Sequence, residues 1–261
     1  LTGEIQNDLR LTGTGHIVVA SCEHWDQIQR RWKQRKVVQA VSLLIMDELH
    51  MIGGQQGPIM EVIVARTRLM ESHFEKSYRI VCLASPVVNA RPLGNWIGAK
   101  KKNQFAFGVP VRHVPVQVDV IGFRENRFAN RIVEMSRPCF NSISNATAAG
   151  EPKSAIVFVA SRKQSQIVAI DMMSFAAASG APDMFVGDAA ALKQSVGVVV
   201  DGALAATLQR GIGFLHEAMS LSDRAVVIDL HKRGKINLLV AARSQIWSMS
   251  RLAAKVVVVM G

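Results

Sequence analysis

Short apolar runs alternate along the chain with longer stretches that have helical periodicity. Each run is too short for a helix and almost continuously apolar, so it predicts a strand that is buried on both faces. Strands of this kind are typical of parallel sheets that helices cover on both sides. The predicted strands are Ile17–Ala20, Leu43–Met46, Ile80–Leu83, Ala155–Val159, Asn237–Ala241 and Val256–Met260.

The stretches between these runs predict helices. Gly57-Pro58 marks the start of one, because proline is favoured at the first helical position, where its missing N–H has no partner to lose. Repeated strand–helix–strand units predict an α/β fold with doubly wound parallel sheets. The residues that follow Pro58 at helical spacing are Ile59, Val62, Ile63, Arg66, Leu69 and Met70.

A segment with two prolines interrupts the alternation. Gly108–Pro115 has no helical period and predicts an extended connector. We therefore place a boundary there and expect two domains, residues 1–112 and 113–261. Asn141–Lys153 is rich in Ser, Ala, Asn and Gly and predicts a surface loop.

Composition and charge narrow the class of protein. The chain is 49% hydrophobic and 20% charged, as folded soluble domains are, and no apolar run approaches the roughly 18 residues of a membrane span. Its three cysteines, Cys22, Cys82 and Cys139, form no C-x-x-C pair, which favours a reducing compartment over a zinc site or a disulfide framework. The net charge of +11 favours a polyanionic partner; the alternative is a basic surface without a specific partner.

The end of the second predicted strand carries the strongest candidate for chemistry. Leu43–Met46 is followed directly by Asp47, Glu48, Leu49 and His50. Carboxylates at the carboxyl end of a parallel strand lie in the crevice where α/β sheets bind ligands. Asp47 could hold Mg²⁺ through water, Glu48 could orient the water that attacks a γ-phosphate, and His50 could sense the phosphate or couple two domains. The alternative is an ordinary turn with solvated carboxylates.

Basic residues cluster around two tryptophans near the N-terminus. Trp25, Ile28 and Trp32 are spaced to share one helix face, and Arg30–Lys36 supplies five positive charges around it. This helix could follow an RNA backbone. The alternative is a helix anchored by its tryptophans with a solvated basic face. Lys100–Lys102 predicts a solvated loop.

Five stretches fall in the order of motifs known from one helicase family. The third contains D-E-x-H-x-I-G-G and then G-P, and the last contains G-x-G-x-L-H-E. Through them the chain resembles the superfamily 2 DExH RNA helicases, in particular the C-terminal, degenerate helicase cassette of the large spliceosomal helicases of the U5 snRNP. The five stretches are Ile17–Asp26, Arg30–Lys36, Asp47–Pro58, Val157–Gln164 and Gly211–Glu217.

The resemblance implies two RecA-like lobes, both incomplete in this chain. The phosphate-binding loop G-x-x-x-x-G-K-[ST] is absent, and Gly261 comes before the segment where the family keeps its arginine finger. ATP and Mg²⁺ are the implied cofactors, with Asp47 as the residue on the metal. Ser161, Arg162 and His216 are the implied RNA contacts, although a structural role is the alternative for His216. The resemblance also implies a nuclear location, and as partners RNA, other spliceosomal proteins and the rest of its own polypeptide, with no membrane.

At two places within the chain, the sequence differs from motifs that active members of the family carry. Active members carry S-A-T after the next strand, where the hydroxyls link ATP hydrolysis to RNA movement, and this chain has Ala84, Ser85 and Pro86. Active members also carry a T-x-x-x-W-G-x-N-like run, of which only Trp247 remains within Ala242–Ser250. The resemblance therefore implies a weak or inactive second cassette that serves as a regulatory and docking module in pre-mRNA splicing.

Three functions stay open from the sequence. The first is this regulatory cassette, the second is a fragment of an active ATP-dependent RNA helicase, and the third is a basic α/β module that uses Asp47 and Glu48 in another metal-dependent reaction on nucleic acid. We expect the chain alone to show no RNA-stimulated ATP hydrolysis. We also expect RNA binding that is weak and sensitive to salt, because phosphate contacts dominate such affinity.

Overall fold

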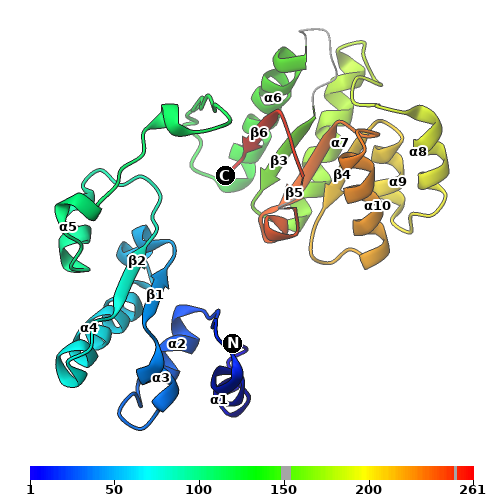
Figure 1. Cartoon of the computed structure of the whole chain (residues 1–261). Helices are drawn as coiled ribbons and strands as arrows, with labels where there is room; N and C mark the ends of the chain where they lie inside the picture. Colours follow the sequence, from blue (N-terminus) through cyan, green and yellow to red (C-terminus); the bar gives the residue numbers. More distant parts are fainter. Residues whose placement is uncertain (148–153, 250–251) are drawn as a thin grey trace. The chain divides into compact units, whose positions relative to one another are not determined.

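The computed structural model describes residues 1–147, 154–249 and 252–261, and the chain forms two compact units (Figure 1). The first unit is Leu1–Val118 and the second is Asp119–Gly261. Both are α/β units with parallel sheets, as the pattern of apolar runs predicts. The connector predicted at Gly108–Pro115 contains one 3₁₀ turn, Val109–Val111, and no strand or α-helix. No described helix is both long and apolar enough to cross a membrane.

The sheet of the first unit has two parallel strands, β1 (Leu43–Met46) and β2 (Arg79–Cys82). Helix α4 (Gly57–Phe74) covers one face, where Met60 and Val64 pack with Met46 of β1. On the same strand, Leu43 and Ile45 are 46% and 58% exposed. The remaining helices of this unit are α1 (Ile5–Thr14), α2 (Cys22–Gln29), α3 (Lys36–Ala40) and α5 (Ala90–Trp96).

Helix α4 begins at Gly57, as predicted, and only some of the residues that follow at helical spacing are buried. Ile63 and Met70 are buried, whereas Val62 and Leu69 are 44% and 57% exposed. Gly57 is needed at the start, because a Cβ there would lie 1.8 Å from the Ile52 carbonyl oxygen. The sequence spacing therefore located the helix correctly, but the spacing alone does not specify which of its apolar residues are buried.

The predicted strand at Ile17–Ala20 is wrong. These residues form neither helix nor strand, and Ile17 and Val19 are 86% and 79% exposed. The physical reason is the lack of a ladder partner, since β1 and β2 pair only with each other in the described part of this unit. The Val19 carbonyl instead accepts a hydrogen bond from the N-terminal ammonium of Leu1 at 2.6 Å.

The predicted helix face of Trp25, Ile28 and Trp32 is also interrupted. Helix α2 ends at Gln29, and Trp32 lies in the turn that follows. The Arg35 guanidinium donates to the carbonyls of Gln27 and Ile28 at 3.2 and 2.6 Å, which satisfies the helix end. Ile28 and Trp32 are nevertheless buried in one small core, at 1% and 6% exposure.

The second unit contains a four-stranded parallel sheet in the order β4-β5-β3-β6 (Figure 1). The strands are β3 (Ala155–Val159), β4 (Ile212–Leu215), β5 (Leu238–Ala242) and β6 (Val256–Val259). Three of them were predicted to within one residue at either end. Strand β4 was not predicted, because Gly213 interrupts its apolar run; a Cβ there would lie 2.9 Å from side-chain atoms of Ile236 and Val227.

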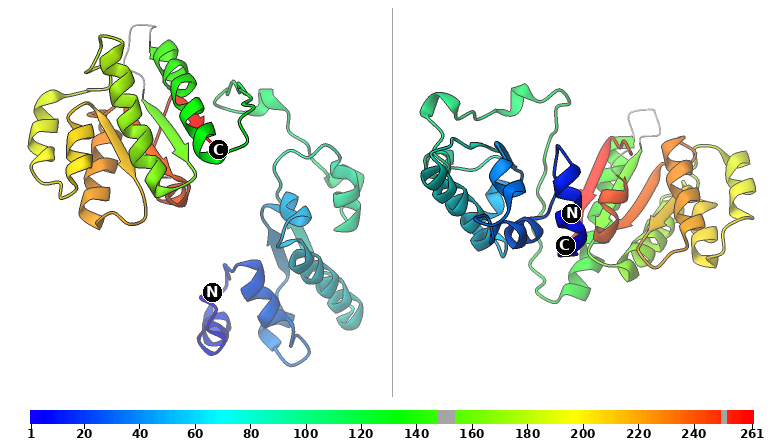
Figure 2. Two further views of the ribbon diagram at one scale, coloured as in Figure 1. Left: turned by 180° about the vertical axis from the view of Figure 1, so that it is seen from behind. Right: turned by 60° about the horizontal axis from the view of Figure 1, so that its bottom comes forward.

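The helices that connect the strands of this sheet pack against it. Figure 2 shows α6 and α7 side by side along it, and α9 and α10 both contact β4. A single apolar core joins these helices to all four strands. The helices of this unit are α6 (Phe128–Thr147), α7 (Arg162–Ala178), α8 (Ala189–Val196), α9 (Gly202–Leu208) and α10 (Leu221–Lys232).

The surface loop predicted at Asn141–Lys153 is wrong for its first part, because α6 continues to Thr147. Residues 148–153 lie outside the described part of the chain. Buried residues recur at helical spacing through this region, among them Ile132, Phe140 and Ile143 at 4%, 3% and 0% exposure. Tertiary burial of this face outweighs the poor helix propensity of its Ser and Asn residues.

Candidate nucleotide and nucleic-acid site

Asp47 and Glu48 lie at the carboxyl end of β1, where the chain leaves the sheet. Both side chains are exposed, whereas Met46 before them and Leu49 after them are buried. Glu48 adopts a left-handed backbone conformation (φ 56°), and its N–H donates to the Asp47 Oδ1 at 2.9 Å. This tight turn presents two adjacent carboxylates at the end of β1, a strand that is buried on one face only and not on both as predicted.

Backbone hydrogen bonds tie this turn to the end of the neighbouring strand. The Leu49 N–H donates to the Leu83 carbonyl at 2.8 Å, and the Leu83 N–H donates to the Met46 carbonyl at 2.9 Å. The D-E-x-H turn and the loop after β2 are therefore held side by side. This arrangement places Asp47 and Glu48 within one structural unit with Ala84, Ser85 and Pro86.

His50 connects the two loops through both of its ring nitrogens. Its Nδ1 accepts a hydrogen bond from the Ser85 N–H at 3.1 Å, and its Nε2 lies 3.2 Å from the Glu48 Oε2. Because Nδ1 accepts this hydrogen bond, the N–H that faces Glu48 is the one on Nε2. The imidazole thus engages one oxygen of the Glu48 carboxylate.

The residues present fit the metal side of a Mg²⁺–nucleotide site. Mg²⁺ keeps several waters and takes one or two protein carboxylates together with phosphate oxygens, and Asp47 is an exposed carboxylate of this kind. Among the described residues, no three His, Cys, Asp or Glu side chains gather as a potential metal site. The metal would therefore be held by Asp47, water and the phosphates of its nucleotide. When bound, it would neutralise charge that develops on the phosphates.

The loop after β2 differs chemically from the S-A-T run of active helicases. Ala84 has no hydroxyl, and Pro86 has no backbone N–H. The one hydroxyl in the run belongs to Ser85, whose side chain is exposed. The hydrogen bond from this loop to His50 of the D-E-x-H turn is donated by the Ser85 backbone N–H and not by a side chain.

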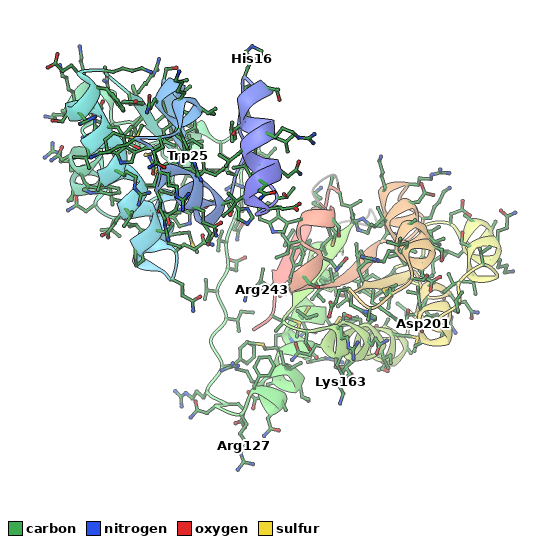
Figure 3. All side chains as sticks on the ribbon, turned by 90° about the horizontal axis from the view of Figure 1, so that it is seen from below. His16, Trp25, Arg127, Lys163, Asp201 and Arg243 are labelled. Atoms are coloured by element: carbon green, nitrogen blue, oxygen red, sulfur yellow. The ribbon has the colours of Figure 1, made fainter. Side chains whose placement is uncertain are left out.

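A second group of predicted residues lies at the carboxyl end of the sheet in the second unit. Ser161 and Arg162 follow β3 at the start of α7, and Figure 3 marks this place with Lys163. The Ser161 hydroxyl accepts from the Gln164 N–H at 3.4 Å, while the Gln164 side chain accepts from the Ser161 N–H at 3.1 Å. The Ser161 side chain is therefore engaged as the N-cap of α7, and Arg162 beside it is exposed.

His216 follows β4 at the same edge of this sheet, but it is not open to a ligand. It is 6% exposed and stacked on Phe214 at 5.9 Å between ring centroids, and neither ring nitrogen has a hydrogen-bond partner. Burial lowers the pKa of His216, and the nearby charges of Glu217 and Asp201 oppose that shift. The imidazole is thus a buried neutral ring.

Two residues that were not among the predicted site residues complete this edge. The Ser244 hydroxyl donates to the Glu217 carboxylate at 2.7 Å, and this hydrogen bond is the main cause of the lowered pKa of Glu217. Arg162 lowers the pKa of Glu217 further through its charge, so these side chains are electrostatic neighbours. Their position directly after β4 and β5 is the signal that could have identified them.

The segment that directly follows β5 contains Trp247, and it forms two short 3₁₀ turns, Arg243–Gln245 and Trp247–Met249. Figure 3 labels Arg243, the first residue beyond the strand. Trp247 is 86% exposed, which is unusual for so large an apolar side chain. The run therefore brings a guanidinium and an indole to the end of the sheet that also carries Arg162.

Comparisons with known proteins agree with this arrangement. Residues 2–89 match the family described as DEAD/DEAH box helicase. The whole chain is 41% identical to the DExH-box ATP-dependent RNA helicase DExH12 of Arabidopsis thaliana over 263 aligned residues. It is 39% and 38% identical to the U5 small nuclear ribonucleoprotein 200 kDa helicases of Homo sapiens and Drosophila melanogaster. The chain spans 12% of the length of each of these relatives.

Solved structures support the fold. A crystal structure of the DUF1998 helicase MrfA bound to DNA and AMPPNP matches all of this chain and 32% of its own length, with a TM-score of 0.51 and 16% identity. At that identity the likeness concerns the fold alone, which is consistent with the RecA-like architecture. Residues 2–89 are thus similar to the DEAD/DEAH box helicase family, and the whole chain is similar to one portion of the DExH RNA helicases and U5 200 kDa helicases.

Proposed function

We propose that this chain is part of a spliceosomal DExH-type RNA helicase and belongs to its second, weak or inactive cassette. In that role it serves in the nucleus as a regulatory and protein-docking module during pre-mRNA splicing. Support comes from relatives whose names place them in the U5 small nuclear ribonucleoprotein, at 38–39% identity over the entire chain. The order of the sequence motifs along the chain supports the same assignment.

One observation carries the proposal of low turnover: the contact between His50 and the Ser85 backbone. In active members, hydroxyls of the S-A-T run link the nucleotide site to RNA movement. Here a backbone N–H holds His50, Ala84 has no hydroxyl to offer, and Pro86 has no N–H. The D-E-x-H residues are present, while Ala84 and Pro86 cannot supply the side-chain hydroxyls that would transmit a change in nucleotide state.

Glu48 provides a second argument for low turnover. Water activation requires a carboxylate oxygen that is free to orient the attacking water. One oxygen of Glu48 lies beside the His50 Nε2, and the side chain as a whole is 60% exposed. Bulk water at this carboxylate favours a solvated group over the dry, preorganised site that phosphoryl transfer needs.

RNA binding in this proposal rests on the second unit. Arg162 is exposed at the start of α7, where the helix dipole adds positive potential, and Arg243 follows β5 at the same edge of the sheet. Phosphates of a nucleic-acid backbone fit this combination. The Glu217 carboxylate in the same cluster opposes it, so the contact is weak.

Binding of fluorescein-labelled oligouridine, measured by anisotropy at low and high salt, tests this function. We expect weak affinity that falls steeply with salt, because each phosphate contact releases a counterion. Arg162→Glu weakens the binding, whereas Lys193→Glu on α8 makes the same charge change away from this edge and has a smaller effect. Affinity that does not change with salt, or an equal loss in both variants, would contradict the proposed surface.

A further inference from the structure

The first unit contains a basic hollow that the nucleotide and RNA sites do not use. It has a volume of about 280 Å³, and it lies where α1 meets the end of α2 and the turn that follows. Figure 3 shows α1, which ends just before the labelled His16, beside α2, the helix that carries the labelled Trp25. The hollow is lined by Ile5, Gln27, Arg30, Arg31 and Arg35.

Positive charge in this hollow exceeds negative charge. Arg30 is paired with Asp26, with its Nη2 2.6 Å from Oδ2, but Asp26 also accepts from Arg66 at 2.8 Å through Oδ1. One carboxylate is therefore shared between two guanidinium groups. Arg31 and Arg35 have no carboxylate partner among the described residues.

Arg31 and Arg35 differ in how freely they can bind a ligand. Arg35 is held in place by the carbonyls of Gln27 and Ile28, and Arg31 is exposed with no side-chain hydrogen bond in the described part of the chain. Burial and then the charge of Arg31 lower the pKa of Arg35, so the two like charges are close enough to repel each other. An anion between them would relieve that repulsion.

The other two lining residues indicate which kind of anion fits. Ile5 is 43% exposed and offers an aliphatic surface, and Gln27 is exposed with an amide that can both donate and accept. A peptide can contact both residues, because its aliphatic side chains can cover Ile5 and its backbone amides can pair with Gln27. Bases of single-stranded RNA would need an open aromatic platform, but Trp32 is 6% exposed and does not line the hollow.

We propose that this hollow binds an acidic segment of a partner protein. A carboxylate of that segment lies between the guanidinium groups of Arg31 and Arg35, an aliphatic side chain covers Ile5, and the Gln27 amide pairs with the peptide backbone. Paired N–H···O bonds from arginine to carboxylate provide both affinity and orientation. The site is independent of the proposed cassette role, because its residues belong neither to the D-E-x-H turn nor to the RNA-binding edge of the second unit.

The test uses the full chain and a fluorescein-labelled peptide in which Asp and Glu alternate with Leu, with fluorescence anisotropy as the readout. Arg31→Glu is the informative variant, because the Arg31 side chain has no structural contact to lose. Arg10→Glu is the matched control, since Arg10 is exposed on α1 but does not line the hollow. Circular dichroism melts of both variants establish that they fold.

We expect Arg31→Glu to weaken peptide binding by about tenfold or more and Arg10→Glu to change it by less than about twofold, because Arg31 lines the hollow and Arg10 does not. Ile5→Ser weakens binding as well, and oligouridine does not displace the peptide. Equal weakening in both arginine variants would show attraction by net charge alone and would overturn the proposal. Displacement by oligouridine would overturn it in favour of a nucleic-acid site.

Discussion

The Nδ1 of His50 accepts a hydrogen bond from the Ser85 N–H at 3.1 Å, which joins the D-E-x-H turn to the loop after β2. The same imidazole lies beside Glu48 through its other nitrogen. A histidine held at both ring nitrogens has a fixed tautomer and a fixed orientation. Two contacts of one imidazole therefore hold the D-E-x-H turn against the loop that contains Ala84, Ser85 and Pro86.

This contact depends on the backbone of Ser85 and not on its side chain. Ser85→Pro removes the N–H donor, so we expect the His50 Nδ1 to lose its partner and the first unit to lose about 1 kcal/mol of unfolding free energy. Ser85→Ala keeps the N–H and serves as the control, with stability close to that of the parent chain. Urea denaturation measures both. A larger loss in Ser85→Ala than in Ser85→Pro would show that the hydroxyl carries the contact.

Two glycines with nearly the same backbone angle predict different costs of substitution. Gly211 has φ +74° and a Cβ there would lie 2.0 Å from the Phe185 carbonyl oxygen, whereas Gly180 has φ +76° and open space around it. Gly180→Ala costs only the left-handed backbone strain, about 1–2 kcal/mol. Gly211→Ala adds a backbone clash and costs more than about 4 kcal/mol. Denaturant unfolding compares them, and equal losses would contradict the packing around Gly211.

Thiol reactivity follows burial in this chain. Burial raises the pKa of Cys139 to about 12 and that of Cys82 to about 11. Because the thiolate is the nucleophile, Cys139 in the folded chain should resist iodoacetamide at pH 8, and Cys22, which is less buried, should react first. Mass spectrometry of alkylated peptides gives the order of modification. Early labelling of Cys139 in the folded protein would contradict its place in the core.

Acid should weaken the second unit before its carboxylates titrate. Burial lowers the folded-state pKa of His216 below the ordinary value of 6.5, so the unfolded chain binds a proton more readily than the folded chain. The stability from this neutral ring is fully present above pH 6.5 and is lost as the pH falls through the folded-state pKa. Thermal melts between pH 7.5 and 5.5 should therefore shift downward, and by less in His216→Phe, which keeps a ring on Phe214. Equal shifts in the parent chain and in His216→Phe would show that His216 does not contribute to the pH dependence of stability.

Prediction of strands from sequence succeeded where an apolar run has a partner strand in the fold. Leu43–Met46 and Ala155–Val159 are apolar runs that have strand partners, and both were predicted at the residues where the strands lie. Ile17–Ala20 has a similar pattern but no partner strand in the described first unit, and a strand cannot form without one. Pattern alone contains no information about which runs find a partner.

For the candidate site, the sequence located groups along the chain but not their exposure. Asp47 and Glu48 are exposed at the end of a strand, as their position after Leu43–Met46 predicts. His216 is buried against Phe214, although the resemblance placed it toward RNA. The hydrogen bond between Glu217 and Ser244 joins residues from two strand ends that are distant in sequence. Such a pair follows from strand order, which the sequence pattern does not specify.

We propose that the D-E-x-H turn of this chain retains the sequence of a nucleotide site but does not drive RNA-dependent turnover. Phosphate release from Mg²⁺–ATP, measured with and without oligouridine for the parent chain and for Asp47→Ala, tests it directly. We predict that oligouridine does not raise the rate and that both proteins give the same background. A robust RNA-stimulated rate that Asp47→Ala abolishes would contradict the claim and favour an active helicase.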